Sequence, residues 1–300
     1  MAKDFVLRRN ESLEAAFRRI ATAQLDRVAA ALTADDLSRE RRVHEARKRF
    51  KESRALLRLY RFALGDAFAG ENRWYRDAGR ALAPYRDASA SVAAVDTLGP
   101  QLRDGGRGVV NKLRRLVRER RAVLYADPVA VDAVFAALLN AFAGERLRLS
   151  DVPLRSGRGA LDDGLASAIA AGRKAMARAY ATGDDTAFHE WRKRAKDQWY
   201  QMQLFLPVWP ELSNVREGAL DHLSQLLGDH HDVTVVRQLV YDQSDVFGGP
   251  AEAQRIGRIL SARQTTLARE AWPIAQRLYA ALPRHQAGEI VALWKVWHRR

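Results

Sequence analysis

One basic phrase occurs twice in this 300-residue chain. It reads His-Glu-x-Arg-Lys-Arg-x-Lys followed by an acidic residue, and it begins at His44 and again at His189, 145 residues further on. Arginine binds phosphate and carboxylate oxygens through paired hydrogen bonds, and lysine binds them as a point charge. The phrase therefore predicts two matched sites for a polyanion. Its recurrence at nearly half the chain length also predicts an internal duplication.

Each copy of the phrase is predicted to form a helix with one cationic face, called here a basic ridge. Positions i, i+3, i+4 and i+7 of a helix share a face, whereas Phe50 and Trp191 fall on the opposite, core side. A merely solvated face is the alternative, but stacked like charges then cost a few tenths of a kcal/mol per pair, which a bound anion removes. The predicted anion-binding residues are His44, Arg47, Lys48, Lys51, Arg54 and Arg58 in the first ridge and His189, Arg192, Lys193 and Lys196 in the second.

The two leading histidines have a structural and a functional interpretation. A single histidine is more often a satisfied structural group than a ligand, but His44 and His189 begin equivalent ridges. Nearby cations should lower the pKa of each imidazole, whereas a bound phosphate would keep it protonated as a hydrogen-bond donor. The functional interpretation predicts that binding strengthens as pH falls.

A second block repeats at the same spacing and ends on a carboxylate. Residues 82–87 match residues 227–232, and Asp87 and Asp232 occupy the final position of each block. The two residues before the carboxylate differ between the copies. We expect each Asp to orient a neighbouring cation of its ridge.

Three histidines fall within the eleven residues that end at Asp232, and such a cluster is typical of a metal site or of a metal-dependent phosphohydrolase. The first half has no histidine at the matching positions, so the cluster is not part of the repeat. The phosphohydrolase remains an alternative, and no metal is expected. The histidines are His222, His230 and His231, and the matching residues are Asp77, Tyr85 and Arg86.

A third match lies further along each half, at a spacing of 143 residues. It contains paired arginines on a predicted basic helix, and we expect them to supplement the ridges. These residues are Arg115 and Arg120 in the first half and Arg258 and Arg263 in the second.

The composition also indicates a polyanionic partner. The net charge is +14 and the pI is near 10.5, as in proteins that bind nucleic acid, an anionic membrane surface or a phosphate polymer. The absence of cysteine excludes disulfides and thiolate catalysis. The longest uncharged, largely apolar run, residues 133–144, is too short to cross a bilayer, and no signal-peptide core is present. A cytoplasmic protein without a membrane partner is expected.

Motifs for catalysis are missing from the sequence. There is no Gly-x-Ser-x-Gly elbow, no P-loop and no dinucleotide-binding glycine motif. We therefore expect a binding protein rather than an enzyme, with no catalytic residue and no cofactor.

The elements that must position these residues are predicted to be helices. Residues 12–32 carry apolar side chains at three- and four-residue spacing, and no alternating strand pattern occurs. Clusters of Gly and Pro mark the connections between helices. The predicted loops are residues 65–70, 99–108, 151–164 and 248–250.

Short connections between about four helices in each half predict an all-α protein of two antiparallel four-helix bundles related by pseudo-twofold symmetry. Each half is expected to contain a first helix, the ridge helix, a helix ending near the repeated Asp, a basic third helix and a closing helix. The predicted units are residues 1–145 and 160–300, with a linker near 145–160. The closing helices are expected at residues 129–142 and 286–299.

The duplicated motifs resemble those of the CHAD family, the conserved-histidine α-helical domains. The resemblance rests on His-x-x-Arg-Lys-x-x-Lys at His44 and His189, and on Leu-x-x-x-Arg-Asp at residues 82–87 with Leu-Gly-x-x-x-Asp-Val at residues 227–233. It covers nearly the whole chain. It implies two four-helix bundles whose basic helices line a central groove that binds inorganic polyphosphate, often on polyphosphate granules.

The chain departs from the family pattern in three respects. His231 stands where the motif has Arg, and Trp199 stands where the first half has Arg54, so weaker anion binding is expected in the second half. The Glu-x-Glu-x-Lys signature of the CYTH triphosphatase domain that accompanies some members is missing, which implies a stand-alone domain.

Nucleic acid is the alternative partner, because aromatic residues near the second ridge could stack bases. These are Trp191, Trp199, Tyr200 and Phe205.

Overall fold

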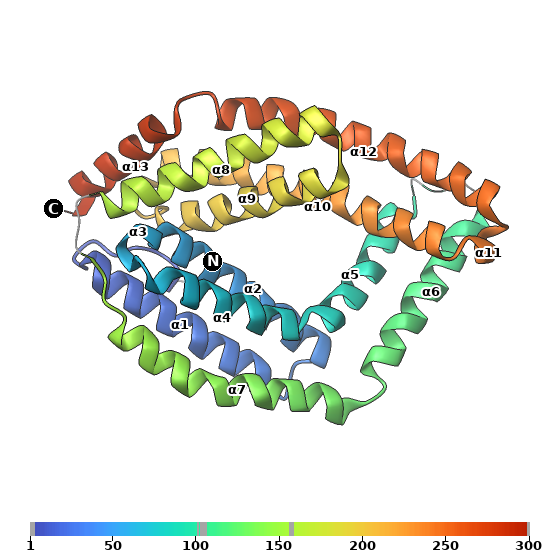
Figure 1. Ribbon diagram of the computed structural model, residues 1–300, viewed down its shortest axis with the longest axis horizontal. Helices are drawn as coiled ribbons and strands as arrows, with labels where there is room; N and C mark the ends of the chain where they lie inside the picture. Colours follow the sequence, from blue (N-terminus) through green and yellow to red (C-terminus); the bar gives the residue numbers. More distant parts are fainter. Residues whose placement is uncertain (1–3, 101, 103–106, 156–158, 299–300) are drawn as a thin grey trace.

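The chain folds into helices (Figure 1). The computed structural model describes residues 4–100, 102, 107–155 and 159–298, and these ranges contain no β-strand. The predicted all-α class is confirmed. The helices of the first half are α1 (Leu13–Thr33), α2 (Arg39–Leu59), α3 (Arg61–Leu64), α4 (Ala67–Ala81), α5 (Ala83–Leu98), α6 (Arg107–Tyr125) and α7 (Pro128–Asp151). Those of the second half are α8 (Ala160–Thr182), α9 (Asp185–Leu204), α10 (Pro210–Asp242), α11 (Ser244–Phe247), α12 (Pro250–Leu278) and α13 (Pro283–His298).

The two ridges lie on α2 and α9, and local sequence explains why both are helical. The Ser38 hydroxyl accepts a hydrogen bond from the Arg41 amide at 3.3 Å and so satisfies an N–H group that has no partner within α2. Asp185 places negative charge at the start of α9, where the helix dipole favours it. Phe50 on α2 and Trp191 on α9 are buried, so each ridge is opposite a core face, as predicted.

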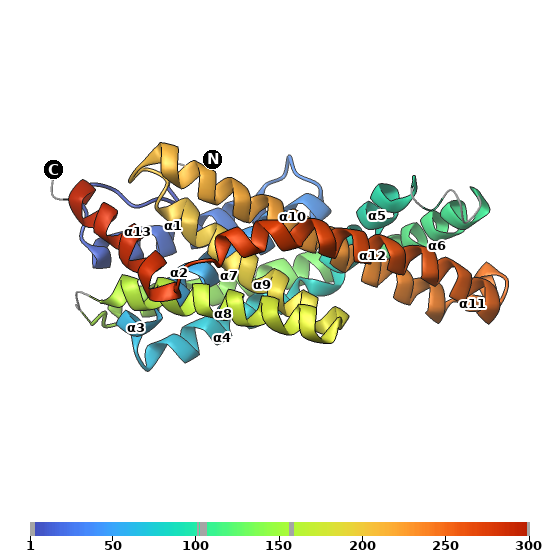
Figure 2. The ribbon, with the colours of Figure 1, turned by 90° about the horizontal axis from the view of Figure 1, so that it is seen from above.

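The helices form two groups (Figure 1). The groups meet where α2 of one packs beside α9 of the other. One group contains α1, α2, α4 and α7, and the other contains α8, α9, α10 and α12, with α13 packed on α8. Figure 2 shows α10 and α12 running together along the long axis toward α11. The paired helices α5 and α6 extend beyond the first group and reach α10 and α11. The internal duplication itself remains a prediction.

The prediction of a helix that ends near the repeated Asp is wrong in both halves, because Asp87 lies within α5 and Asp232 within α10. Asp232 lies within the 33-residue helix α10, whereas the matching stretch of the first half is divided at Leu82 into α4 and α5. Pro84 accounts for the break, because proline lacks an N–H group and disfavours a helical conformation at the preceding residue. The matching residue of the second half is Asp229, which allows α10 to continue.

Several predicted loops are shorter than expected because helices extend into them. Only Gly65 and Asp66 separate α3 from α4, and Gly164 lies inside α8. The helix α7 continues to Asp151, so it occupies the start of the predicted linker at 145–160. Residues 101, 103–106, 156–158 and 299 of the predicted elements lie outside the described residues. The loop predicted at 248–250 is present at Gly248 and Gly249, with φ angles of 105° and 94°, and α12 begins at Pro250.

The helix α7 is long and apolar enough to cross a bilayer by length and composition alone. Core helices meet the same criterion, and α7 packs against α1. Phe135, Leu138 and Phe142 on α7 are buried in the hydrophobic core.

Candidate functional site

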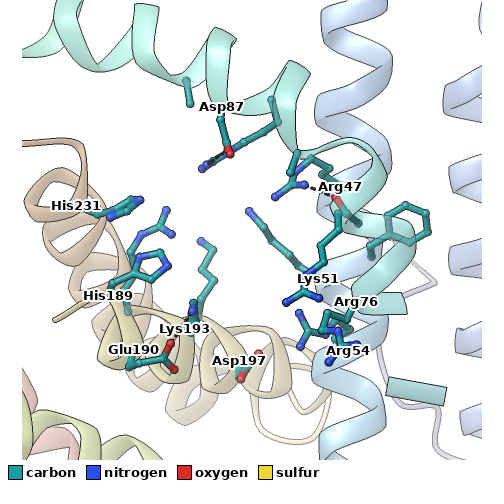
Figure 3. Close-up of a pocket in the computed structure, with 18 of the residues that line it drawn as sticks. Arg47, Lys51, Arg54, Arg76, Asp87, His189, Glu190, Lys193, Asp197 and His231 are labelled. Atoms are coloured by element: carbon teal, nitrogen blue, oxygen red, sulfur yellow. Dashed lines mark hydrogen bonds and ion pairs between the residues drawn. The ribbon is translucent and has the colours of Figure 1, made fainter. Parts of the chain in front are cut away.

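A cavity of about 750 Å³ opens between α2, α4, α5, α9 and α10 (Figure 3). Figure 3 shows Arg47 and Lys51 directed across this space toward His189 and His231. Eleven lysines and arginines line the cavity, against four carboxylates, so its field favours an anion. The cations are Arg47, Lys51, Arg54, Arg58, Arg76, Arg80, Arg86, Arg192, Lys193, Arg194 and Lys196. The carboxylates are Asp87, Glu190, Asp197 and Asp232.

Most of the predicted ridge residues share this cavity. His44 is exposed and Lys48 is half-buried, and neither lines the cavity. Lys48 points to the side because successive residues of a helix are rotated by about 100°, and the cavity faces the row that contains Arg47 and Lys51. Both predicted carboxylates, Asp87 and Asp232, lie in the lining, as do Arg47, Lys51, Arg54, Arg58, His189, Arg192, Lys193 and Lys196.

The four predicted arginines of the third helices do not join the ridges. They lie on α6 and α12, whereas that side of the cavity is formed by α5 and α10. Arg120 lines a separate pocket of about 400 Å³ between α5, α6 and α10. Arg115 lies 3.8 Å from Glu119, and Arg263 lies 3.9 Å from Glu270. Arg258, the fourth, is exposed on α12.

Four cavity arginines were not predicted from the sequence. One of them, Arg194, lies on α9 within the repeated basic phrase itself. Arg76 and Arg80 lie on α4, and the matching positions in the second half are Asp221 and Gln225, so the repeat contained no signal for them. Arg86 could have been found, because it directly precedes the repeated Asp87 in the second block. Its guanidinium lies 2.9 Å from the Asp87 carboxylate.

Hydrogen bonds hold several of the arginines in place at the cavity wall. Arg58 of α2 pairs with Asp197 of α9 at 2.8 Å, which joins the two ridges directly. Arg47 donates to the carbonyl oxygen of Gly79 on α4. Arg54 donates through Nε to the side-chain oxygen of Asn72 at 3.2 Å. These contacts fix the guanidinium groups before any ligand binds.

Two lysines of the ridges, Lys51 and Lys196, lie half-buried in the cavity wall. Burial, reinforced by surrounding arginines, lowers the pKa of Lys51 to about 7. Burial is also the main cause that lowers the pKa of Lys196 to about 8. The Lys196 amine lies 3.4 Å from the centroid of the Trp199 ring, so this ring contacts a lysine of the ridge.

The histidines of the cavity are paired with each other. The rings of His189 and His231 are 4.2 Å apart between centroids. Burial, together with nearby cations, lowers the pKa of both, that of His231 to about 4. The pKa of His44, outside the cavity, is also lowered, first by partial burial. The direction of the pKa change is the expected one, but burial rather than the neighbouring cations is its first cause.

The histidine cluster of the second half does not assemble. His230 is buried and stacks on Phe188 at 4.3 Å, whereas its neighbour His231 faces the cavity and His222 is exposed. Adjacent residues of α10 point in different directions, so sequence proximity did not produce convergence. No group of three or more His, Asp or Glu side chains in the described ranges is placed to hold a metal ion.

Comparisons with known proteins agree with this architecture. The family model described as the CHAD domain matches residues 13–241. The crystal structure of the CHAD domain from the plant Ricinus communis superposes with a TM-score of 0.64 and 20% sequence identity, covering 93% of this chain and 96% of that one. A search of curated protein sequences returned no match. The match of the family model to most of the chain, together with the shared helical fold, shows that the chain belongs to the CHAD domain family.

Proposed function

We propose that the chain binds inorganic polyphosphate in the cavity between α2 and α9, and that it acts as a binding module without catalytic chemistry. The observation that carries this proposal is the excess of eleven cations over four carboxylates around one cavity. A phosphate polymer has closely spaced charges and no bases, so charge density and fixed guanidinium groups suffice to recognise it. In a cell that stores polyphosphate, the chain is expected on the granules.

Polyphosphate is favoured over nucleic acid because the aromatic residues are not available as stacking platforms. Trp191 and Phe205 are buried in the core. Trp199 is half-buried beneath the Lys196 amine. Recognition of single-stranded nucleic acid usually needs exposed rings on which bases stack. The cavity instead presents charge on every side.

Calorimetric titration with polyphosphate tests the location of the site. The double variant Arg80→Glu/Lys193→Glu alters two partly exposed cavity cations, whose side chains are 70% and 49% exposed. We expect at least a tenfold loss of affinity, because charge-assisted contacts contribute about 1.5–3 kcal/mol each. The control Arg115→Glu/Arg258→Glu makes the same charge change outside the cavity and should retain most of the affinity.

Equal losses in the two double variants would show that net charge alone, rather than the cavity, governs binding.

A competition experiment distinguishes polyphosphate from nucleic acid as the partner. Polyphosphate should displace RNA or DNA at a lower phosphate concentration than the reverse displacement requires. The opposite order would favour nucleic acid as the ligand.

A further inference from the structure

Lys51 and Lys196 differ from Lys193, the third lysine of the cavity, in being half-buried and in lacking an acidic partner. They occupy matching positions of the two ridges, on α2 and α9. Within the described ranges, neither amine has a carboxylate within 4.0 Å. By contrast, Lys193 is 49% exposed and pairs with Glu190 at 2.6 Å. Neither amine therefore has an acidic neighbour at ion-pair distance to offset the repulsion from surrounding cations.

The surroundings of Lys51 are cationic on three helices. Arg47 faces it from α2, Arg86 from α5, and Arg192 and Lys196 from α9. Burial acts first, and these four charges add to it, so the pKa falls to about 7. Arginine stays protonated in proteins, so the lysine is the group in this cluster that can relieve the repulsion by losing a proton.

Lys196 has a mixed but still unfavourable environment. Arg192 on its own helix and Lys48 on α2 oppose its charge, whereas Asp221 and Glu217 of α10 attract it from beyond ion-pair distance. Burial outweighs that attraction, and the pKa falls to about 8. At pH 8 the two unliganded amines are therefore partly or mostly neutral.

We propose that Lys51 and Lys196 gain protons when a phosphate polymer enters the cavity, so that binding of the polymer is coupled to proton uptake. This inference rests on the proposed function. The polymer would neutralise the surrounding arginines and place negative charge beside each amine. Both changes favour the protonated amines and return their pKa toward the ordinary value.

The coupling sets the direction of the pH dependence. Because binding takes up protons, affinity falls as pH rises, by about tenfold per pH unit for each proton taken up. The window is pH 7–9, where the unliganded lysines are partly or wholly neutral. His189 and His231 face the same cavity and lie close to each other. Their lowered pKa values confine their own proton uptake to more acidic solution, so measurements at pH 8 separate the two pairs.

Calorimetry in two buffers counts the protons directly. A linear polyphosphate of defined length is titrated at pH 8 in buffers with different enthalpies of ionisation, and the dependence of the observed enthalpy on the buffer enthalpy gives the protons taken up. We expect about one proton per binding event, as linkage requires for amines that begin mostly deprotonated. The variant Lys51→Arg/Lys196→Arg keeps both charges but cannot titrate, so it should bind without measurable uptake and lose the decline in affinity between pH 7 and 9.

Each result decides a different question. Binding without proton uptake by the unmodified protein would overturn this inference and leave the proposed function intact. Unchanged uptake by the double variant would assign the protons to other groups and also overturn it. A failure of polyphosphate to bind at all would overturn both proposals. Carbon-13 NMR of labelled lysine in the unmodified protein follows the amines without substitution, and two lysine signals whose pKa rises on addition of polymer are the expected result.

Discussion

Glu145 of α7 is a buried carboxyl group at the side of α4, one of the helices that line the cavity. It is fully buried, pairs with Arg148, and lies beside Glu71 of α4. Burial, followed by the neighbouring Glu71 carboxylate, raises the pKa of Glu145 to about 8. At neutral pH the Glu145 carboxyl is therefore mostly protonated. That proton removes the repulsion between the Glu145 and Glu71 carboxylates, which the single Arg148 guanidinium otherwise has to offset.

The substitution Glu145→Gln should change how stability depends on pH. In the unfolded chain a glutamate titrates near its ordinary pKa of about 4.3, well below the folded value. The stabilising contribution of the proton is complete below pH 4 and is lost as pH rises through about 8. Between these limits the unmodified protein should lose up to about 1.4 kcal/mol per pH unit relative to the variant. Urea unfolding at pH 5, 6, 7 and 8 measures the difference.

The exposed substitution Glu119→Gln on α6 is the matched control, since the Glu119 side chain is 63% exposed. It should leave the pH profile of the unmodified protein unchanged. A Glu145→Gln variant with the same pH profile as the unmodified protein would show that Glu145 ionises normally in the folded state.

At the scale of elements, the contact between α8 and α2 joins the two halves at close range. A Cβ atom at Gly164 of α8 would lie 1.8 Å from the carbonyl oxygen of Leu59 in α2. No real side chain fits at that distance, and the obstacle is backbone rather than a flexible side chain. The sequence predicted a loop at Gly164, but this residue lies inside α8. Because it has no side chain, α8 can approach the backbone of α2 closely.

The substitution Gly164→Ala should therefore destabilise the protein, even though alanine is the better helix former. We expect a loss of about 1–3 kcal/mol from overpacking as α8 is forced away from α2. Gly218→Ala in α10 is the control, because nothing lies within 4 Å of the added Cβ atom. It should stabilise the protein by about 0.5–1 kcal/mol. Thermal and urea unfolding compare the two, and equal effects would contradict the close contact.

At the scale of the whole molecule, the cavity exists only because the two halves meet. The first half contributes α2, α4 and α5, and the second contributes α9 and α10. Side chains tie the halves together behind the cavity, where Gln201 of α9 donates to the Ala55 carbonyl oxygen of α2 at 3.1 Å. The N-terminal segment adds a further tie through a 2.9 Å hydrogen bond from the Leu7 amide to the Leu204 carbonyl oxygen.

Binding of polyphosphate should weaken steeply as the salt concentration rises, because the cavity lining contributed by both halves carries a large net positive charge. Its lining carries seven more lysines and arginines than carboxylates. By analogy with single-stranded nucleic acid, a plot of log affinity against log salt concentration should have a slope of about −5. Titrations at several salt concentrations give the slope, and Arg80→Glu/Lys193→Glu should make it shallower. A slope near zero would mean that ionic contacts do not dominate binding.

The sequence by itself determined the helical class, the two ridge helices and the family. These follow from local information, because helical periodicity, capping residues and repeated motifs are all contained in short segments. Even the break between α4 and α5 is encoded locally, by Pro84.

Only the tertiary structure decided which charges act together. It added Arg76, Arg80, Arg86 and Arg194 to one cavity, and it left His44 and Lys48 outside. The physical reason is that the packing of distant apolar residues sets how each helix is rotated and where it crosses its neighbours. The same packing set Lys51 and Lys196 close to other cations and partly out of water, and this placement cannot be read from their spacing along the chain.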